Sequence, residues 1–429
     1  MRTIEKSLKL YDRAQKVIPG AAQTMSKMYG RFAQGVAPPF ISGGSGAYVF
    51  DCDGNKYLDW TAALGPVILG YGALGPKTNA PKLRPSLPLP HLYEVELAEK
   101  LVEKIPCAEM VRFGKTGSDV TSAAVRLARH VTGRGGVVCM GYHGWHDWYA
   151  GTLPSPRSDG VPWGVREYVH KIDYSDLTTL KNLFEDPEKH IACLILEPMS
   201  RYAPEQANRQ HLLKLKEMCA KHRVVLVFDE MIMGFRHAVG GGGELFGVEP
   251  DLACFGKAMG NGYSISALVG RRDLMQELEH LHFSGTFFGE TIGLAAALDT
   301  IEFIHMNDVI SRLWDKGTLL NPKIRRLINK HNLGNNGDSC VHLKGYGPWS
   351  SFEWKEECFE EQCLFLQEVV KRGILYSRDH FIMHAHTEED IKKTLNVYDE
   401  VFGYIRDCMD KGTVNQNLEG RIEKEKFPR

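Results

Sequence analysis

The sequence is poor in net charge, in long apolar runs and in closely spaced cysteines. Its 429 residues carry 52 basic and 53 acidic side chains, which leaves a formal net charge of -1. This balance leaves no excess of positive charge that would attract nucleic acid or an anionic membrane. No apolar run is long enough to span a bilayer, and residues 1–20 alternate charged and apolar positions without the apolar core of a signal peptide. We therefore expect a cytoplasmic protein with neither nucleic-acid nor membrane partners.

The ten cysteines are scattered through the chain without a CxxC pair. Cys139, Cys193 and Cys254 lie inside apolar runs, where a thiol is a typical core residue. His143 and His146 in "GYHGWHD" have the spacing of a metal pair, but no acidic or cysteine partner follows at ligand-like spacing. The pattern predicts reduced cysteines, no disulfide framework and no metal site.

Short apolar runs of strand type recur at 135–141, 191–198, 223–230 and 266–270, and helical patterns such as 211–222 separate them. Continuous apolar strands that alternate with helices predict an α/β fold with a mostly parallel sheet covered on both faces. In such sheets the polar residues at the carboxyl ends of the strands line the ligand crevice. Glu197 and Asp229 occupy two of these ends.

The length favours two domains, and the pattern changes after about residue 300. We expect an N-terminal segment over 1–60, a large domain over 61–300 and a smaller α/β C-terminal domain over 301–429. In the last of these, Thr387 and Asp390 are spaced as the capping box of a terminal helix. The glycine run 240–243 is predicted to be a flexible loop, and the polar tail after Lys411 to be poorly ordered.

The stretch "FGKTGSDV" (113–120) looks like a phosphate loop that enters a helix. A nucleotide-binding P-loop requires glycine five residues before Gly114, and that position holds Glu109, which rejects the P-loop. The turn Thr116-Gly117-Ser118 opens a helical pattern, whose N-terminus suits a phosphate monoester. The other interpretation is that Ser118 or Asp119 only caps the helix.

Lys257 lies at the end of an apolar strand between two glycines, Gly256 and Gly260. Burial of an ammonium group without a partner is costly, and a buried neutral lysine is a nucleophile toward aldehydes. Taken alone, Lys257 is better explained as a surface lysine whose stem is buried, and Asp229 as a helix cap or a member of an ion pair. A phosphate anchor, a Schiff-base lysine and a carboxylate for a pyridinium nitrogen together are what pyridoxal phosphate requires of a protein.

The motifs resemble those of class III pyridoxal-phosphate aminotransferases, in the branch that contains glutamate-1-semialdehyde aminomutase. The resemblance runs from "GSGAYVFDCDGNKYLDW" to "HTEEDI" and implies fold type I. It implies that Asp229 of "DEMIMGFR" pairs with the ring nitrogen and that Met231 packs on one face of the ring. Lys257 of "CFGKAMGNG" would form the Schiff base, and Tyr142 of "GYHGWHD" would stack on the other ring face.

The resemblance also implies an obligate homodimer with a shared active site. Thr286 of "SGTFFGE" would bind the phosphate of the neighbouring subunit's cofactor, and the phosphate of the chain's own cofactor would lie on Thr116, Gly117 and Ser118. The remaining candidate cofactor contacts are His143 and Glu197. The activity implied is transamination from an amino donor, glutamate by default in the family, to an aldehyde or ketone.

The substrate is where the sequence departs from the aminomutase, which carries a Ser-Pro-Val-Arg motif whose arginine holds the substrate carboxylate. The corresponding stretch here is "MSKMYGRF", with Tyr29 at the position of that arginine and Arg31 out of register. A simple aminomutase is therefore disfavoured. Five residues suggest a hydroxylated acceptor such as a sugar: Tyr29, Trp145, Trp148, Tyr202 and His380. Candidates for a carboxylate clamp are Arg201, Arg236 and Arg378.

Other outcomes stay open on the same scaffold. A racemase would return the proton to the alpha carbon, and a decarboxylase would first release CO2. A non-catalytic pyridoxal-phosphate sensor would need an interaction module, and the sequence shows neither a basic appendage nor a helix-turn-helix candidate.

Overall fold

The computed structural model describes residues 2–73, 75, 77–79, 83–200, 204–333 and 340–423. The chain divides into two compact units, which we call the sheet unit (residues 74–310) and the terminal unit (residues 1–73 together with 311–428). The first 60 residues therefore belong to the same unit as the C-terminal region. None of the helices in the described ranges combines the length and the apolar character needed to cross a bilayer.

The sheet unit is built around a seven-stranded sheet in the order β4-β10-β9-β8-β7-β5-β6. The strands are β4 (Met110–Gly114), β5 (Gly136–Met140), β6 (Val169–Lys171), β7 (Ile191–Leu196), β8 (Val225–Asp229), β9 (Leu252–Phe255) and β10 (Ser266–Gly270). Strands β5 to β9 run parallel to one another, whereas β10 is antiparallel to both β9 and β4. This confirms the prediction of a mostly parallel sheet.

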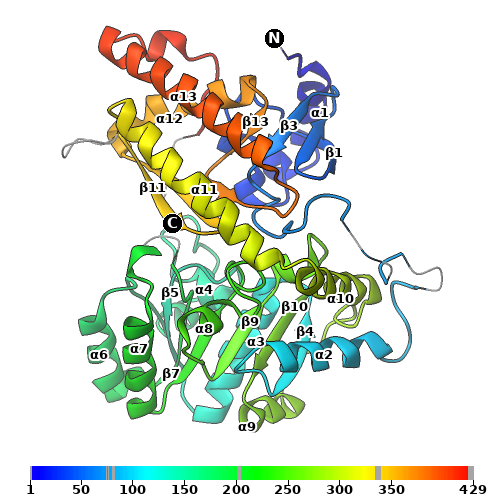
Figure 1. The fold of residues 1–429 in the computed structure, drawn as a ribbon. Helices are drawn as coiled ribbons and strands as arrows, with labels where there is room; N and C mark the ends of the chain where they lie inside the picture. Colours follow the sequence, from blue (N-terminus) through cyan, green and yellow to red (C-terminus); the bar gives the residue numbers. More distant parts are fainter. Residues whose placement is uncertain are drawn as a thin grey trace. The chain divides into compact units, whose positions relative to one another are not determined.

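The sheet is buried on both faces, because every residue of β5, β7, β8, β9 and β10 is buried. Figure 1 shows the helices of the same unit around it. They are α2 (Leu92–Lys104), α3 (Gly117–Thr132), α4 (Asp147–Ala150), α5 (Trp163–Arg166), α6 (Leu177–Glu185), α7 (Arg209–His222), α8 (Gly241–Phe246), α9 (Arg272–Met275) and α10 (Thr291–Met306). The apolar face of α3, including Val120, Ala124 and Leu127, packs on alternate residues of the sheet such as Val227 and Cys254.

The terminal unit contains two small sheets, β1-β2-β3-β13 and β11-β12-β14. Its strands are β1 (Ile41–Ser45), β2 (Tyr48–Asp51), β3 (Lys56–Asp59), β11 (Val341–Tyr346), β12 (Trp349–Trp354), β13 (Ile374–Leu375) and β14 (Asp379–Phe381); its helices are α1 (Glu5–Gln15), α12 (Phe359–Lys371) and α13 (Glu388–Lys411). Helix α11 (Val309–Lys330) begins at the boundary of the units. The capping box predicted for Thr387 and Asp390 opens α13, as expected.

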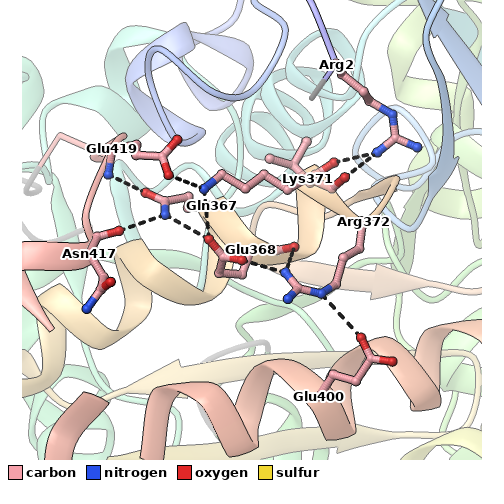
Figure 2. Close-up of polar contacts among 9 residues, drawn as sticks. Arg2, Gln367, Glu368, Lys371, Arg372, Glu400, Asn417 and Glu419 are labelled. Atoms are coloured by element: carbon pink, nitrogen blue, oxygen red, sulfur yellow. Dashed lines mark hydrogen bonds and ion pairs between the residues drawn. The ribbon is translucent and has the colours of Figure 1, made fainter. Parts of the chain in front are cut away.

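The segment that follows α13 packs against α12, so the predicted poor ordering of the tail is wrong for residues 412–423. The buried Gln367 accepts a hydrogen bond from the backbone N–H group of Glu419 at 2.7 Å and donates one to the carbonyl of Asn417 at 3.0 Å (Figure 2). Gln367 also accepts the backbone N–H group of Gly420 at 3.0 Å. Lys371 adds an ion pair to Glu419 at 2.6 Å. A polar tail is ordered here because α12 supplies its hydrogen-bond partners.

Two further expectations fail. Cys340 and Cys358 form a disulfide, with 5.7 Å between their Cα atoms, so the prediction that every cysteine is reduced is wrong for this pair. The Glu361 carboxylate lies close enough to both sulfurs for the three residues to hold a metal ion, but the disulfide leaves neither sulfur as a thiolate ligand. The glycine run 240–243 is not a flexible loop, because Gly241, Gly242 and Gly243 are buried in the first turn of α8.

Candidate active site

The predicted site residues follow the carboxyl ends of neighbouring strands. Asp229 is the last residue of β8, Lys257 follows β9, Glu197 follows β7, and Tyr142 and His143 follow β5. Strands β5, β7, β8 and β9 are adjacent and parallel, so their carboxyl ends lie at one edge of the sheet. The structure therefore gathers five candidates from distant parts of the sequence at this edge.

The turn 116–118 lies at the same edge, since β4 is antiparallel to β10 and β10 is antiparallel to β9. Thr116 is the N-cap of α3: its hydroxyl accepts the Asp119 N–H at 3.3 Å, and the Asp119 carboxylate accepts the Thr116 N–H at 2.7 Å. The cap is thus Thr116, rather than Ser118 or Asp119. The N–H groups of Gly117 and Ser118 have no partner within the helix, so this turn keeps two donors and a positive helix end for an anion.

Ser118 fastens this turn to the loop that follows β5. Its hydroxyl accepts the backbone N–H of Trp145 at 3.2 Å. Gly144 has a φ of +106°, and a Cβ atom at this position would lie 2.2 Å from the Ser118 Oγ. Glycine is therefore required at 144 both by its backbone conformation and by the close approach of Ser118.

Met231 packs against two glycines from different parts of the site. A Cβ atom on Gly117 would lie 2.9 Å from the Met231 Sδ atom, and a Cβ atom on Gly256 would lie 2.8 Å from the same sulfur. The thioether therefore lies between the turn that opens α3 and the residue that precedes Lys257. A flexible, polarisable side chain suits this position, because it can fill an irregular gap between two segments.

Asp229 and His143 form a buried pair at the centre of this edge. The His143 Nδ1 atom is 2.8 Å from the Asp229 Oδ2 atom, and the two side chains are 0% and 3% exposed. The other ring nitrogen, Nε2, is 3.1 Å from the carbonyl oxygen of Met140, which can only accept a hydrogen bond. Nε2 therefore donates the bond to this carbonyl, and Nδ1 faces the Asp229 carboxyl group within hydrogen-bond distance.

The remaining candidates differ in exposure. Tyr142 is 47% exposed, and its ring meets Tyr149 edge-on with 5.4 Å between the centroids. Lys257 has a φ of +42°, a left-handed conformation that is uncommon outside glycine and clusters at functional sites. The buried Glu197 lies against Gly141, where a Cβ atom would be 2.5 Å from the Glu197 Oε2 atom.

Thr286 is exposed in the segment that precedes α10. Within the described residues of this single chain, no hydrogen bond links it to the candidates above. The segment ends at Glu290, whose carboxylate accepts a hydrogen bond from the Lys115 Nζ atom at 2.9 Å. Lys115 immediately precedes the turn 116–118, so this ion pair connects that turn to the segment that carries Thr286 and ends at Glu290.

Several residues suggested for substrate binding are packed in the core instead. The Tyr29 hydroxyl accepts the N–H of Gly35 at 2.6 Å, the Trp148 indole N–H donates to Ser122 at 2.9 Å, and His380 lies 2.9 Å from the Tyr398 hydroxyl. Burial is the reason these polar atoms have protein partners. Trp145 is 71% exposed.

The arginines suggested as a carboxylate clamp also differ in their surroundings. Arg236 is fully buried, and burial lowers the pKa of its guanidinium to about 9, so it is a core residue. Arg378 is half-buried in the terminal unit. Arg201 and Tyr202 lie outside the described residues.

Sequence reasoning missed Glu230, the neighbour of Asp229. Its fully buried carboxylate accepts the N–H groups of Gly242 and Gly243 at 2.8 and 2.9 Å. Burial raises its pKa to about 8, while these two hydrogen bonds act in the opposite direction. An acidic residue ten positions before the glycine run 240–243 was the available signal, because backbone N–H groups of glycines are accessible donors.

Residues 31–380 match the model of the aminotransferase class III family. The chain belongs to this family. This class III aminotransferase is 31% identical over 420 residues to 3-aminobutyryl-CoA aminotransferase from Cloacimonas acidaminovorans, with 94% of this chain and 98% of the relative covered. It is 34% identical over 425 residues to glutamate-1-semialdehyde 2,1-aminomutase from Chlorobium luteolum, with 92% and 97% covered.

A solved structure with a similar fold is the FumI protein of Sphingopyxis sp. MTA144, in its pyridoxal-phosphate internal aldimine form. It has a TM-score of 0.84 at 26% identity and covers 97% of this chain and 99% of its own. The class III aminotransferase described here thus has fold type I, and pyridoxal 5'-phosphate is the cofactor of its family.

Proposed function

We propose that the enzyme transfers an amino group from an amino donor, with glutamate as the default, to an aldehyde or ketone at the site around Lys257 and Asp229. One observation carries this proposal. A buried carboxyl group, hydrogen-bonded to a buried histidine, lies at the same sheet edge as a lysine with a left-handed backbone conformation and a helix N-terminus that offers N–H donors. When bound, pyridoxal phosphate supplies the electron sink for a carbanion at the substrate carbon.

The residues present fit this cofactor. The N–H groups of Gly117 and Ser118, with the exposed Thr116, form an anion site for its phosphate. Asp229, oriented by His143, offers a carboxylate to the ring nitrogen and keeps a proton there.

The ring faces and the reacting amine come from other positions. Met231, packed on Gly117 and Gly256, and the exposed ring of Tyr142 are assigned to the two faces of the cofactor ring. The Lys257 amine forms the covalent link and, once displaced by the donor, moves a proton at the substrate carbon. Glu197 follows the neighbouring strand and is assigned to the cofactor's surroundings.

A homodimer is part of the proposal. Thr286 is exposed, and the next residue, Phe287, is 61% exposed. Leu89, which precedes α2, and Leu92 and Val95, in the first turn of α2, are also large apolar residues on the surface of the sheet unit. An exposed apolar surface of this kind is typical of a face that another chain covers. We propose that a second copy covers it and that Thr286 then completes the phosphate site of that copy.

The acceptor stays a prediction. Of the five residues that suggested a sugar, three are buried, Tyr202 lies outside the described residues, and Trp145 alone is well exposed. The aminomutase outcome is the alternative that the similarity to Chlorobium luteolum keeps open, whereas the buried Tyr29 at the position of its arginine weighs against it. Racemase and decarboxylase outcomes, and a cytoplasmic location, likewise stay predictions.

The first test is the visible absorption spectrum of the purified protein with pyridoxal phosphate, before and after glutamate and then a panel of other amines, without a carbonyl acceptor. We expect one donor to convert the lysine-bound cofactor to its pyridoxamine form, with one oxo product per site. A band that no donor converts would favour the racemase or decarboxylase outcome. No lysine-bound band at all would refute the assignment of Lys257.

Two variants sharpen this test. Lys257→Ala should abolish turnover while the phosphate and ring sites still bind cofactor. Asp229→Asn keeps the shape of the side chain and should bind cofactor but lose most of the rate. Unchanged kinetics in Asp229→Asn would mean that the carboxylate is structural.

A further inference from the structure

The Lys115–Glu290 ion pair joins two segments that the proposed function assigns to two different active sites. Lys115 precedes the turn 116–118, which would hold the phosphate of the chain's own cofactor. Glu290 ends the segment that carries Thr286, which would reach the cofactor of a second copy. The Lys115 Nζ atom is 2.9 Å from the Glu290 Oε2 atom, and the two side chains are only 15% and 18% exposed.

On the turn side, Lys115 is fixed by its backbone as well as by its ammonium group. Its N–H donates to the Asp119 carboxylate at 3.1 Å, the carboxylate that also caps α3. Its carbonyl accepts the Ser264 hydroxyl at 2.9 Å, and its Nζ atom donates to the Ser264 carbonyl at 3.2 Å. A movement of Lys115 would therefore move the capping residues of the phosphate turn.

On the other side, Glu290 is the N-cap of α10. Its two carboxylate oxygens accept the N–H groups of Ile292 and Gly293 at 2.7 and 3.1 Å. A Cβ atom on Gly293 would lie 3.0 Å from the Lys115 Nζ atom, so the ammonium group closes directly over the first turn of α10. The ion pair and the helix N-terminus both lower the pKa of Glu290, against the opposing effect of its burial.

We propose that Lys115 and Glu290 are positioning residues that couple the phosphate sites of the two subunits. This inference rests on the proposed function, in which Thr286 completes the site of a second copy. The pair holds the turn 116–118 within one site and fixes the end of the segment that carries Thr286 for the other. Loss of the pair should then weaken cofactor binding at both sites, although neither residue is among those assigned to the cofactor.

Heterodimers with two affinity tags test this directly. One subunit carries Lys257→Ala, so that only the other subunit, the reporter, gives the absorption of lysine-bound cofactor. Glu290→Gln is placed either on the reporter subunit or on the Lys257→Ala subunit. The affinity of the apo-heterodimer for pyridoxal phosphate is then measured at the reporter site.

We expect both placements to weaken binding at the reporter site about five- to twentyfold, the range for a partly buried charge-assisted pair. Lys115→Met should behave in the same way, and Lys115→Arg, which keeps the charge, should restore most of the affinity. Lys181→Met, which breaks the exposed Lys181–Glu185 pair of the same unit, is the matched control and should leave the affinity unchanged.

The outcomes separate the possibilities. An effect only when Glu290→Gln lies on the reporter subunit would show that the pair acts within one site, and the coupling would be refuted. No effect from either placement would refute it as well. Thr286→Ala on the Lys257→Ala subunit is the reference: if it leaves the reporter site unchanged, or if light scattering shows a monomer, the shared site itself fails and the coupling with it.

Discussion

Replacement of His143 by phenylalanine removes one polar interaction and keeps the ring. The His143 ring is stacked on Trp148 with 6.3 Å between centroids and meets Tyr149 edge-on at 5.7 Å, and a phenyl ring preserves both contacts. What is lost is the pair of hydrogen bonds, one from Nε2 to the Met140 carbonyl and one between Nδ1 and Asp229. The variant therefore isolates the polar contribution of His143 from its packing.

The magnitude follows from the hydrogen bond to the carboxylate. Asp229 also accepts the Met231 N–H at 3.1 Å, so the variant removes one of the donors that orient it. A hydrogen bond to a charged group contributes about 1.5–3 kcal/mol, which corresponds to roughly 10- to 150-fold in a rate at 1.36 kcal/mol per tenfold. Because Asp229 is assigned to the ring nitrogen, we expect that loss in kcat/KM for the half-reaction with the amino donor.

The assay is single-turnover conversion of the cofactor by the donor, followed by absorption. His146→Phe is the matched control: it makes the same substitution three residues further on, where the ring nitrogen meets Ser122 instead of Asp229. We expect His146→Phe to stay within about threefold of the parent enzyme. If His143→Phe retains the parent rate, or if both variants lose equal activity, the assigned role of the Asp229–His143 pair is wrong.

Three other predictions test different parts of the structure. Gly256→Ala places a methyl group 2.8 Å from the Met231 sulfur, so cofactor affinity should fall while thermal unfolding of the apo-protein changes little; equal losses in both would contradict the assignment of Met231. The pKa of Glu230 is raised to about 8 in the folded state, so its contribution to stability is fully present below about pH 4.5 and is lost as the pH rises to about 8. Glu230→Gln should therefore flatten the melting-temperature profile over this pH range. Parallel profiles of the variant and the parent protein would refute the raised pKa. Reduction of the Cys340–Cys358 disulfide, which closes a loop of 18 residues, should cost about 3 kcal/mol in unfolding free energy, whereas Cys52→Ser should leave the effect of reductant unchanged.

The sheet and its polar edge were predictable because their signals are local. A buried parallel strand is a continuous apolar run, and the residue that follows it lies at the ligand edge whatever the rest of the chain does. Asp229 and Glu197 were placed in this way, and the turn 116–118 by its short polar sequence before a helical pattern. The order of the strands was not predictable, since it depends on pairing between distant segments.

The errors have a different origin, because each depends on the folded surroundings of a residue, which its chemical type does not show. Tyr29 and His380 were attributed to a substrate site on their chemical type, but each is buried with a protein partner for its polar atom. The tail after Lys411 is polar, yet Gln367 of α12 supplies partners for its backbone. The pairing of Cys340 with Cys358 requires that the chain between them turn back, which no local spacing shows.

The glycines of the site show why its precise shape could not be read from the sequence. In the sequence, Gly117, Gly144 and Gly256 indicate turns, and a turn residue suggests flexibility. In the structure each is a point of close approach, two to Met231 and one to Ser118. A glycine in such a place does not make the backbone flexible, because the neighbouring side chain fills the space that a Cβ atom would take. The same three contacts connect the turn 116–118, the loop after β5 and the residue before Lys257. The site is therefore held together by packing between segments, and this packing depends on glycines that have no catalytic group.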